Sequence, residues 1–271
     1  MIQMIKKPSV SICIITYNHV KFIEKSIKSV LSQKTNFDWE LIIADDFSND
    51  GTREILYNYK KKYPSKINLI IRDKNIGPCK NFEELILSAK NDYIAYLEGD
   101  DYWHDKSKIQ NQLSYMQKKP ECSMSFTNAV VNNLKTNIKK YRNRYNENKK
   151  FTFRKVLFLG GGFYPSSSIV YKTKLMQNNI KFISSHSTGD YSLALIASYF
   201  GTIDYLNFCS TTYNVHDKSM TNSDYDKNYI LKKYYADMNL NIKFAHKCYK
   251  KFKLSNSLKK KLIFREKYLF V

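Results

Sequence analysis

The first 130 residues alternate between two patterns that together restrict the possible folds. Short apolar runs alternate with segments in which apolar residues recur at helical spacing. We expect strands at Val10–Thr16, Trp39–Ala44, Ile67–Ile71, Tyr93–Leu97 and Ser123–Val131. We expect helices at Lys21–Gln33, Glu54–Tyr63, Asn81–Ala89 and Lys106–Lys118. This alternation predicts an α/β fold in which a mostly parallel central sheet carries helices on both faces.

Polar residues gather where three of these expected strands end. They are Thr16, Tyr17 and Asn18 after the first strand, Asp45 and Asp46 after the second, and Glu98, Gly99, Asp100 and Asp101 after the fourth. In open α/β sheets, ligands bind beyond the carboxyl ends of the strands, near the point where the strand order reverses. The sequence therefore predicts one site at this edge of the sheet.

The segment from Glu98 to Asp101 is the sharpest chemical feature. Three carboxylates within four residues repel one another, and a folded chain tolerates them best when a cation neutralises them. Oxygen ligands suit Mg²⁺ or Mn²⁺ rather than zinc. Gly99 would let a ligand approach closely. The alternative interpretation is an acidic turn that caps the next helix; the position at a strand end favours a site.

The other polar groups have two open interpretations each. Asp45 and Asp46 are either solvated loop acids, with Asp50 capping the next helix, or acceptors of hydrogen bonds from a ribose hydroxyl or a base N–H. Tyr17 either stacks on a nucleobase or simply packs against the protein.

The second half has weaker patterns. The polar, basic stretch 132–150 indicates a mobile surface loop, and Gly160–Gly162 a flexible joint. Extended segments are expected at Ser168–Tyr171, Ile203–Leu206 and Phe208–Tyr213. Gly189 and Asp190 open a helical stretch that runs to Tyr199, and from Tyr225 the chain has helical tendency.

Composition excludes several protein classes. In 271 residues, 43% are hydrophobic, which permits a sizeable core and excludes a mainly disordered chain. No apolar run reaches the 18 or more residues of a membrane span. The five cysteines are dispersed without a C-x-x-C pair, which argues against a disulfide framework and a structural zinc site. The apolar run near the start is short and lacks a cleavage site, so we expect a cytoplasmic protein.

The net charge of +21 is concentrated toward the end of the chain. Residues 225–271 hold 13 Lys and Arg against 3 Asp and Glu, a local charge of 13 − 3 = +10. These residues either form a solvated helical face packed on the core or contact an anionic membrane surface. Nucleic-acid binding is a weaker alternative, because no DNA- or RNA-binding motif accompanies the charge, and we expect no nucleic-acid partner.

Five motifs, in order, resemble glycosyltransferase family 2. They are Pro8-Ser-Val-Ser-Ile-Cys-Ile-Ile-Thr-Tyr-Asn18, Ser26-Ile-Lys-Ser-Val-Leu-Ser-Gln33, Leu41-Ile-Ile-Ala-Asp-Asp-Phe-Ser-Asn-Asp-Gly-Thr52, Asn75-Ile-Gly77 and Tyr96-Leu-Glu-Gly-Asp-Asp-Tyr-Trp103. The resemblance is dense over residues 8–130, thinner over 160–220 and absent from the tail. It implies a GT-A-type fold, a nucleoside-diphosphate-sugar donor, a divalent cation (Mn²⁺ or Mg²⁺) and inversion at the anomeric carbon.

The resemblance also implies roles for single residues. Asp46 matches the carboxylate that binds the base, usually uracil, and Asp100 and Asp101 match acids that face the ribose, metal and diphosphate. Glu98 stands where the family more often has Asp. The full set of expected nucleotide-sugar-binding residues is Thr16, Tyr17, Asn18, Asp45, Asp46, Gly77, Asn81, Glu98, Gly99 and Asp100. The expected metal ligands are Asp100, Asp101 and His216.

Asp190 matches the position of the family's catalytic base. An inverting transfer is an in-line displacement, so the base must lie across the sugar from the leaving diphosphate and come from a distant segment. From the residues alone, an N-cap of the following helix is the simpler interpretation of Asp190. A lone surface histidine is the alternative for His216. Ser166, Ser167 and Ser168 are candidates for the acceptor side.

The resemblance divides the chain into a GT-A-type domain, 1–220, and a basic C-terminal extension, 221–271. Within the domain, 8–130 would bind the nucleotide-sugar and 131–220 would face the acceptor. The expected activity is transfer of a sugar, with a UDP-sugar as donor, to a glycan or lipid-linked glycan of a surface polysaccharide. The competing hypothesis is a catalytically inert sugar-nucleotide or glycan-binding module. A Rossmann dehydrogenase is disfavoured because no G-x-G-x-x-G follows the first strand.

Overall fold

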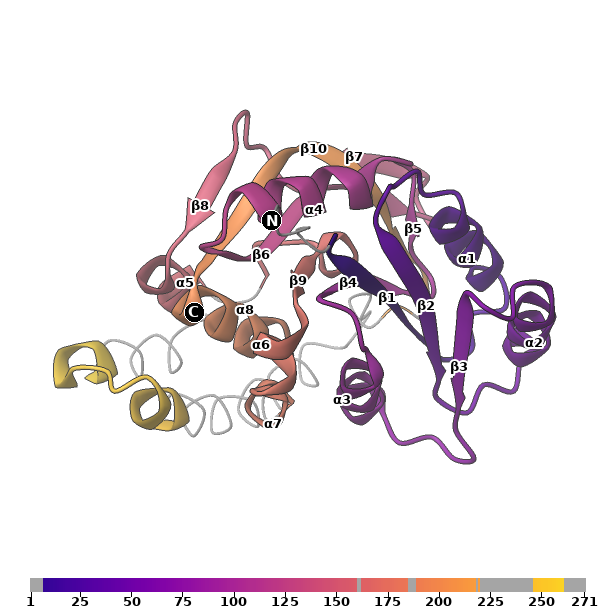
Figure 1. Cartoon of the computed structure of the whole chain (residues 1–271), viewed down its shortest axis with the longest axis horizontal. Helices are drawn as coiled ribbons and strands as arrows, with labels where there is room; N and C mark the ends of the chain where they lie inside the picture. The colour runs from indigo at the N-terminus through magenta and orange to yellow at the C-terminus, as the bar shows by residue number, and fades with distance from the viewer. Residues whose placement is uncertain (1–6, 160–161, 185–188, 218, 220–245, 261–271) are drawn as a thin grey trace, which may run out of the picture.

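The four expected strands of the first half form a parallel sheet. The computed structural model describes residues 7–159, 162–184, 189–217, 219 and 246–260 (Figure 1). The strands are β1 (Ser9–Thr16), β2 (Asp38–Asp45), β3 (Ile67–Ile71) and β4 (Tyr93–Glu98). β1 lies between β2 and β4, and all these pairings are parallel. The carboxyl ends of β1, β2 and β4 therefore meet at one edge, as the sequence predicted.

Helices cover both faces of this sheet. One apolar cluster joins the strands to α1 (Ile23–Leu31), α2 (Thr52–Lys62) and α4 (Lys108–Lys118). The other cluster joins the opposite face to α3 (Pro78–Ser88) and to helices of the second half. β1 residues alternate between the two clusters, with Ile12 and Ile14 in one and Cys13 in the other. Burial on both faces explains why the strand is a continuous apolar run.

The second half extends the same sheet with mixed strand directions. The order is β3-β2-β1-β4-β9-β6-β10-β5. The added strands are β5 (Tyr102–Trp103), β6 (Cys122–Asn133), β9 (Val170–Lys172) and β10 (Thr202–Val215). β9 pairs antiparallel with both β4 and β6, whereas β6 and β10 are parallel. The helical elements of this half are α5 (Phe153–Leu159), η1 (Ser166–Ser168), α6 (Thr173–Gln177), α7 (Ile180–Ile183) and α8 (Gly189–Phe200).

Two expectations for the second half were wrong. The stretch 132–150, expected to be a mobile loop, contains β7 (Ile138–Tyr141) and β8 (Lys149–Phe151), which pair with β6 and β10. Its polar composition reflects an exposed edge of the sheet rather than lack of structure, since all four β7 residues are exposed. The two strands expected between 203 and 213 are one strand, β10, interrupted by bulges near Cys209.

The C-terminal extension lies largely outside the described residues. Its described part, 246–260, contains helical turns at 246–251 and 256–260. Phe252 is buried and packs against Phe153 and Tyr199, with ring centroids 5.0 and 4.7 Å away. This part of the extension is therefore packed on the core. Within the described ranges, no helix is both long and apolar enough to cross a membrane.

Candidate active site

The acid segment lies at the junction of β1 and β4. Glu98 ends β4 opposite Ile15 of β1, and the Gly99 N–H donates to the Ile15 carbonyl at 2.9 Å. A Cβ atom on Gly99 would lie 2.7 Å from Thr16 Oγ1 and 2.8 Å from His19 Nδ1. We expected this glycine to admit a ligand; the structure instead places the chain's own Thr16 and His19 against it. Only a residue without a side chain allows the two strand ends to approach so closely.

Asp100 lies between two histidines. Its Oδ2 is 3.0 Å from His216 Nε2 and 4.0 Å from His19 Nε2. The His216 ring stacks on Phe22 at 4.6 Å, which fixes its orientation. Burial raises the pKa of Asp100, but the His216 hydrogen bond and the His19 charge outweigh it, and the pKa is lowered overall. Asp100 and His216, both expected as metal ligands from the family resemblance, are thus brought together from 116 positions apart.

His19 was missed by the sequence analysis. It follows the Thr16–Asn18 motif directly, and this adjacency was the available signal. Its ring Nδ1 lies 3.2 Å from Thr16 Oγ1, and its backbone N–H donates to Thr52 Oγ1 at 3.0 Å. Burial is the main cause that lowers the pKa of His19, despite the opposing effect of Asp100. The ring is therefore held at the acid cluster by the loop that follows β1.

Glu98 and Asp101 carry buried oxygens without partners. Among the described residues, Glu98 Oε2 and Asp101 Oδ2 have no hydrogen-bond partner, and neither carboxylate forms an ion pair. Burial raises the pKa of Glu98 to about 8, with Asp100 adding to the effect. Burial, followed by the charges of Asp100 and Glu98, raises the pKa of Asp101 well above its usual range. A nearby cation would reverse these shifts.

Asn214 of β10 was also missed, although it lies two residues before His216. Its backbone N–H donates to Asp101 Oδ1 at 2.9 Å, and its side-chain amide donates to the Asp100 carbonyl at 2.6 Å. Asn132 of β6 donates to the Asn214 side-chain oxygen at 2.8 Å. The second half of the sheet thereby holds the acid segment in place from its far side.

The serine run of η1 lies behind the acids. Ser167 and Ser168 are fully buried, and the Ser168 hydroxyl donates to the Thr127 and Pro165 carbonyls. Hydrogen bonds from Ser166 to Glu98 and from Ser167 to Asp101 lower the pKa values of these acids, against the larger effect of burial. Ser166 and Ser167 thus hydrogen-bond to the acids, whereas Ser168 connects η1 to β6.

The carboxylates after β2 have a different environment. Asp45 is fully buried, and its Oδ2 accepts hydrogen bonds from Arg53 Nε at 2.8 Å and the Ser48 N–H at 3.0 Å. The carboxylate of Asp46 accepts the Ile76 and Gly77 N–H groups at 2.8 and 2.9 Å. Gly77 has a φ of +84°, which favours glycine at this turn. Because a carboxylate has about four acceptor positions, Asp46 retains capacity for a further donor.

The remaining nucleotide-binding candidates differ in accessibility. Tyr17 is 46% exposed, whereas Thr16 and Asn81 are buried. Asn81 donates to the Ala44 carbonyl at 3.1 Å and accepts from Arg72 Nε at 3.3 Å. Asn18 accepts the Asn49 N–H at 3.0 Å and so ties the loop after β1 to the loop after β2. Of this group, Tyr17 is the side chain most open to a ligand.

Asp190 lies in the first turn of α8. Its side chain is exposed, yet the surrounding protein lowers its solvation and raises the pKa to about 6, while the Arg142 charge opposes this rise. Asp190 in turn contributes to raising the pKa of Glu98, so the two carboxyls are within electrostatic reach. The buried Tyr164 hydroxyl donates to the Asp190 carbonyl at 2.5 Å. The structure therefore brings Asp190 to the same site as the acids after β4.

A divalent cation fits this donor set when a ligand completes it. Within the described ranges, no three His, Cys, Asp or Glu side chains are arranged to hold a metal ion on their own. Mg²⁺ in phosphate-binding enzymes is commonly held by one or two carboxylates together with substrate phosphates. Asp101 Oδ2, which lacks a partner, and the Asp100–His216 pair provide such a partial set.

The chain matches a known family over more than half of its length. The sequence profile described as glycosyl transferase family 2 matches residues 11–180. The putative teichuronic acid biosynthesis glycosyltransferase TuaG of Bacillus subtilis is 38% identical over 121 residues, which are 45% of this chain and 46% of TuaG. The matched region spans less than half the length of the first curated relatives.

Solved structures show the same fold. Staphylococcus aureus TarS 1–349 in complex with UDP-GlcNAc superposes with a TM-score of 0.71 at 16% identity, over 97% of this chain and 73% of the TarS chain. The mannosyltransferase PcManGT of Pyrobaculum calidifontis, in complex with GDP-Man and Mn²⁺, superposes with a TM-score of 0.61 at 13% identity, over 97% and 70% of the two chains. The expected GT-A-type α/β fold is thus confirmed.

Proposed function

Because the chain belongs to glycosyltransferase family 2, we propose that it transfers a sugar from a nucleoside-diphosphate-sugar to a glycan hydroxyl. A UDP-sugar is the expected donor, and inversion at the anomeric carbon the expected stereochemistry. The UDP-GlcNAc bound to TarS and the GDP-Man bound to PcManGT support this donor class. The name of TuaG supports an acceptor that belongs to a surface polysaccharide, either a glycan or a lipid-linked glycan.

One observation carries the proposal. The Asp190 carboxylate lies close enough to Glu98 to contribute to raising the pKa of Glu98, although the two residues are 92 positions apart in sequence. Asp101 forms no ion pair within the described residues, and the pKa of Asp190 is raised to about 6. A general base with a pKa near the working pH can remove a proton efficiently. We propose that the leaving diphosphate binds beside the acids after β4 and that Asp190 acts as the base on the other face of the sugar.

The reaction follows from these positions. The acceptor hydroxyl would approach Asp190, which accepts its proton as the oxygen attacks the anomeric carbon. The C–O bond to the diphosphate breaks on the opposite face, beside Asp100 and Asp101. Asp100, Asp101 and His216 would hold Mn²⁺ or Mg²⁺, which offsets the charge that builds on the leaving diphosphate. Asn214 and His19 position Asp100 and Asp101, and Tyr17 is the candidate to contact the nucleobase.

We also propose where this reaction takes place. A donor made in the cytoplasm and a lipid-linked acceptor would meet at the inner face of the membrane. The extension 221–271 carries much of the basic charge of the chain, and anionic lipids attract such segments. We therefore propose a cytoplasmic enzyme with a peripheral membrane contact through this extension.

A donor assay tests the proposed function. The full chain is incubated with UDP-GlcNAc, UDP-Glc, UDP-Gal or GDP-Man, with Mn²⁺ or with EDTA, and release of the nucleoside diphosphate is measured with and without added glycans. We expect release from one donor that depends on Mn²⁺ and is lost in Asp190→Asn. Donor binding without any release across the panel would instead favour the inert sugar-nucleotide-binding module.

A further inference from the structure

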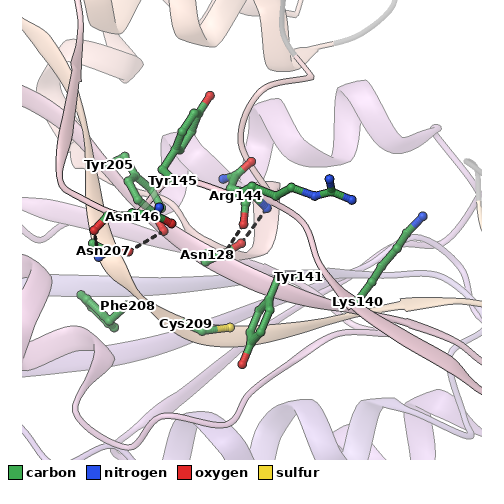
Figure 2. A pocket seen from close by; sticks show the side chains of 11 residues that line it. Asn128, Lys140, Tyr141, Arg144, Tyr145, Asn146, Tyr205, Asn207, Phe208 and Cys209 are labelled. Atoms are coloured by element: carbon green, nitrogen blue, oxygen red, sulfur yellow. Dashed lines mark hydrogen bonds between the residues drawn. The ribbon is translucent and has the colours of Figure 1, made fainter.

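A second polar hollow lies in the acceptor-side half, and none of its lining residues belongs to the acid cluster. It has a volume of about 520 Å³ and lies between the β7–β8 connection and β10 (Figure 2). Its walls carry asparagine amides, aromatic rings and two basic side chains, Lys140 and Arg144, and no carboxylate. Planar rings and amide groups in a concave site are suited to a ligand with both apolar faces and hydroxyl groups, such as a sugar.

Both walls of the hollow are held by specific hydrogen bonds. The β10 bulge places Leu206 opposite Thr127 and Cys209 opposite Asn128, so the two residues between them leave the strand pairing. Asn128 is 8% exposed, and its amide both accepts from the Asn143 N–H and donates to the Asn143 carbonyl, each at 2.8 Å.

Asn207, one of the two bulged residues, fixes the rest of the connection. It donates to the Asn146 carbonyl and the Asn148 side-chain oxygen at 2.8 and 2.7 Å. The bulge and the connection therefore form a built site rather than a gap between loops.

Two basic side chains of the hollow have no acidic partner in the part of the chain that the structure describes. Lys140 and Arg144 are exposed and form no ion pair with any described residue. Two cations with no nearby acid in the lining favour a ligand that carries negative charge.

The hollow and Asp190 lie on the same face of the sheet. Tyr205, in the wall of the hollow, contacts Phe126 at 5.3 Å, and Phe126 contacts Tyr164 at 5.9 Å. Tyr164 then hydrogen-bonds to the Asp190 carbonyl. Arg142 lies between Tyr141 and Asn143 of the hollow, and its charge lowers the pKa of Asp190. Arg142, next to two lining residues, thus places the hollow within electrostatic reach of the proposed base.

We propose that this hollow binds an anionic unit of the acceptor glycan, a sugar or polyol that carries a phosphate or carboxylate, while a neighbouring hydroxyl of the same acceptor reaches Asp190. Lys140 and Arg144 bind the anion, and Tyr141 contacts the face of the unit. This inference rests on the proposed glycosyl transfer and specifies its acceptor class.

Calorimetric titration of the full chain tests the inference. The probes are an oligogalacturonate hexamer, a glycerol-phosphate oligomer and the neutral maltohexaose. The variant Lys140→Gln/Arg144→Gln removes both cations from the hollow. Its matched control, Arg154→Gln/Lys155→Gln, removes the same charge from two exposed residues of α5 that do not line the hollow. Binding of UDP-GlcNAc with Mn²⁺ is measured for each protein in parallel.

We expect at least one anionic oligomer to bind about tenfold or more tightly than maltohexaose, and the stronger of the two identifies the anion. The hollow variant should lose about tenfold or more of this affinity, and the α5 control should keep it. Equal binding of neutral and anionic oligomers, or full affinity in the hollow variant, would overturn the inference. Normal glycan binding with no donor binding in any protein would contradict the proposed transfer and leave the anion site standing.

Discussion

Two strands that flank β1, namely β2 and β4, carry a pair of aspartates at or just after their carboxyl ends, and the two pairs have different partners. The negative charges of Asp45 and Asp46 are compensated by the protein itself, through Arg53 and through backbone N–H groups. Asp101 is equally buried and receives only the Asn214 and Ser167 hydrogen bonds, with no ion pair in the described ranges. Asp45 also has one oxygen without a partner, so the decisive difference is the nearby cation that Asp45 has and Asp101 lacks.

This difference indicates that the acids after β2 stabilise the fold, whereas the acids after β4 are suited to bind a ligand. A buried carboxylate paired with arginine stabilises the loop around it, and removal of either partner leaves an uncompensated charge. A buried carboxylate without a cation stabilises nothing until one binds. We therefore expect substitutions after β2 to affect stability first, and substitutions after β4 to affect activity first.

The largest expected effect is that of Asp101→Asn on transfer. Loss of the carboxylate weakens the cation site that opposes charge on the leaving diphosphate, so the rate should fall by about 10³-fold. The free energy of unfolding should change by less than about 1 kcal/mol, because no ion pair is lost. Asp92→Asn, at the opposite end of β4, is the control and should keep its rate. A rate of Asp101→Asn within about threefold of wild type would show that the acids after β4 do not differ from those after β2 in their importance for activity.

Asp45→Asn should show the reverse behaviour. The variant leaves Arg53, whose side chain is 23% exposed, without its acid, so urea denaturation should give a free energy of unfolding lower by about 3 kcal/mol. At temperatures where the variant is folded, donor-dependent release should persist. If the unfolding midpoint stays at the wild-type value, the Arg53 ion pair does not stabilise the loop.

Alanine substitutions at two glycines near these strand ends distinguish the stability cost of overpacking from that of backbone strain. Gly99→Ala places a Cβ atom against Thr16 and His19 and should cost about 2 kcal/mol of stability through overpacking. Gly77→Ala meets no atom within 4 Å and should cost about 1 kcal/mol, because only its positive φ is strained. Thermal unfolding of both variants measures the difference, and a larger cost at Gly77 would be inconsistent with it.

The smallest expected effect is on the pH dependence of the rate, through the proposed base Asp190. The base must be deprotonated, so the rate at saturating substrate should rise about tenfold per pH unit up to about 6 and then level off. Arg142→Gln removes a charge that lowers the pKa of Asp190, so the rise should move to higher pH. An unchanged profile in Arg142→Gln would show that Asp190 does not govern the acidic limb.

The sequence predicted the parts of the site that local patterns encode. The buried runs of β1, β2 and β4 fix three strand ends, and parallel pairing alone brings Asp45, Asp46 and Asp100 to one edge. The family resemblance added Asp190 and His216, and the structure brings both to the acid cluster. The roles of the individual residues remain predictions that the experiments above address.

The rest depends on contacts that no local pattern reveals. β7 and β8 are polar because they form exposed edges, so their composition resembles that of a loop. The β10 bulges shift which side chains face the hollow, and a period-two pattern fails across such a shift. His19 and Asn214 act through partners 81 and 113 positions away, and such pairs are visible only in the folded chain.

Electron paramagnetic resonance of Mn²⁺ tests the central claim most directly, because free Mn²⁺ gives a strong signal that weakens on binding. The claim is that the acids after β4 hold a cation only together with a diphosphate. We predict that UDP strongly reduces the free Mn²⁺ signal with the wild-type chain and with Asp92→Asn, and that Asp101→Asn shows no more reduction than UDP alone. Equal reduction by Asp101→Asn and wild type, or no effect of the wild-type chain beyond that of UDP, would contradict the account.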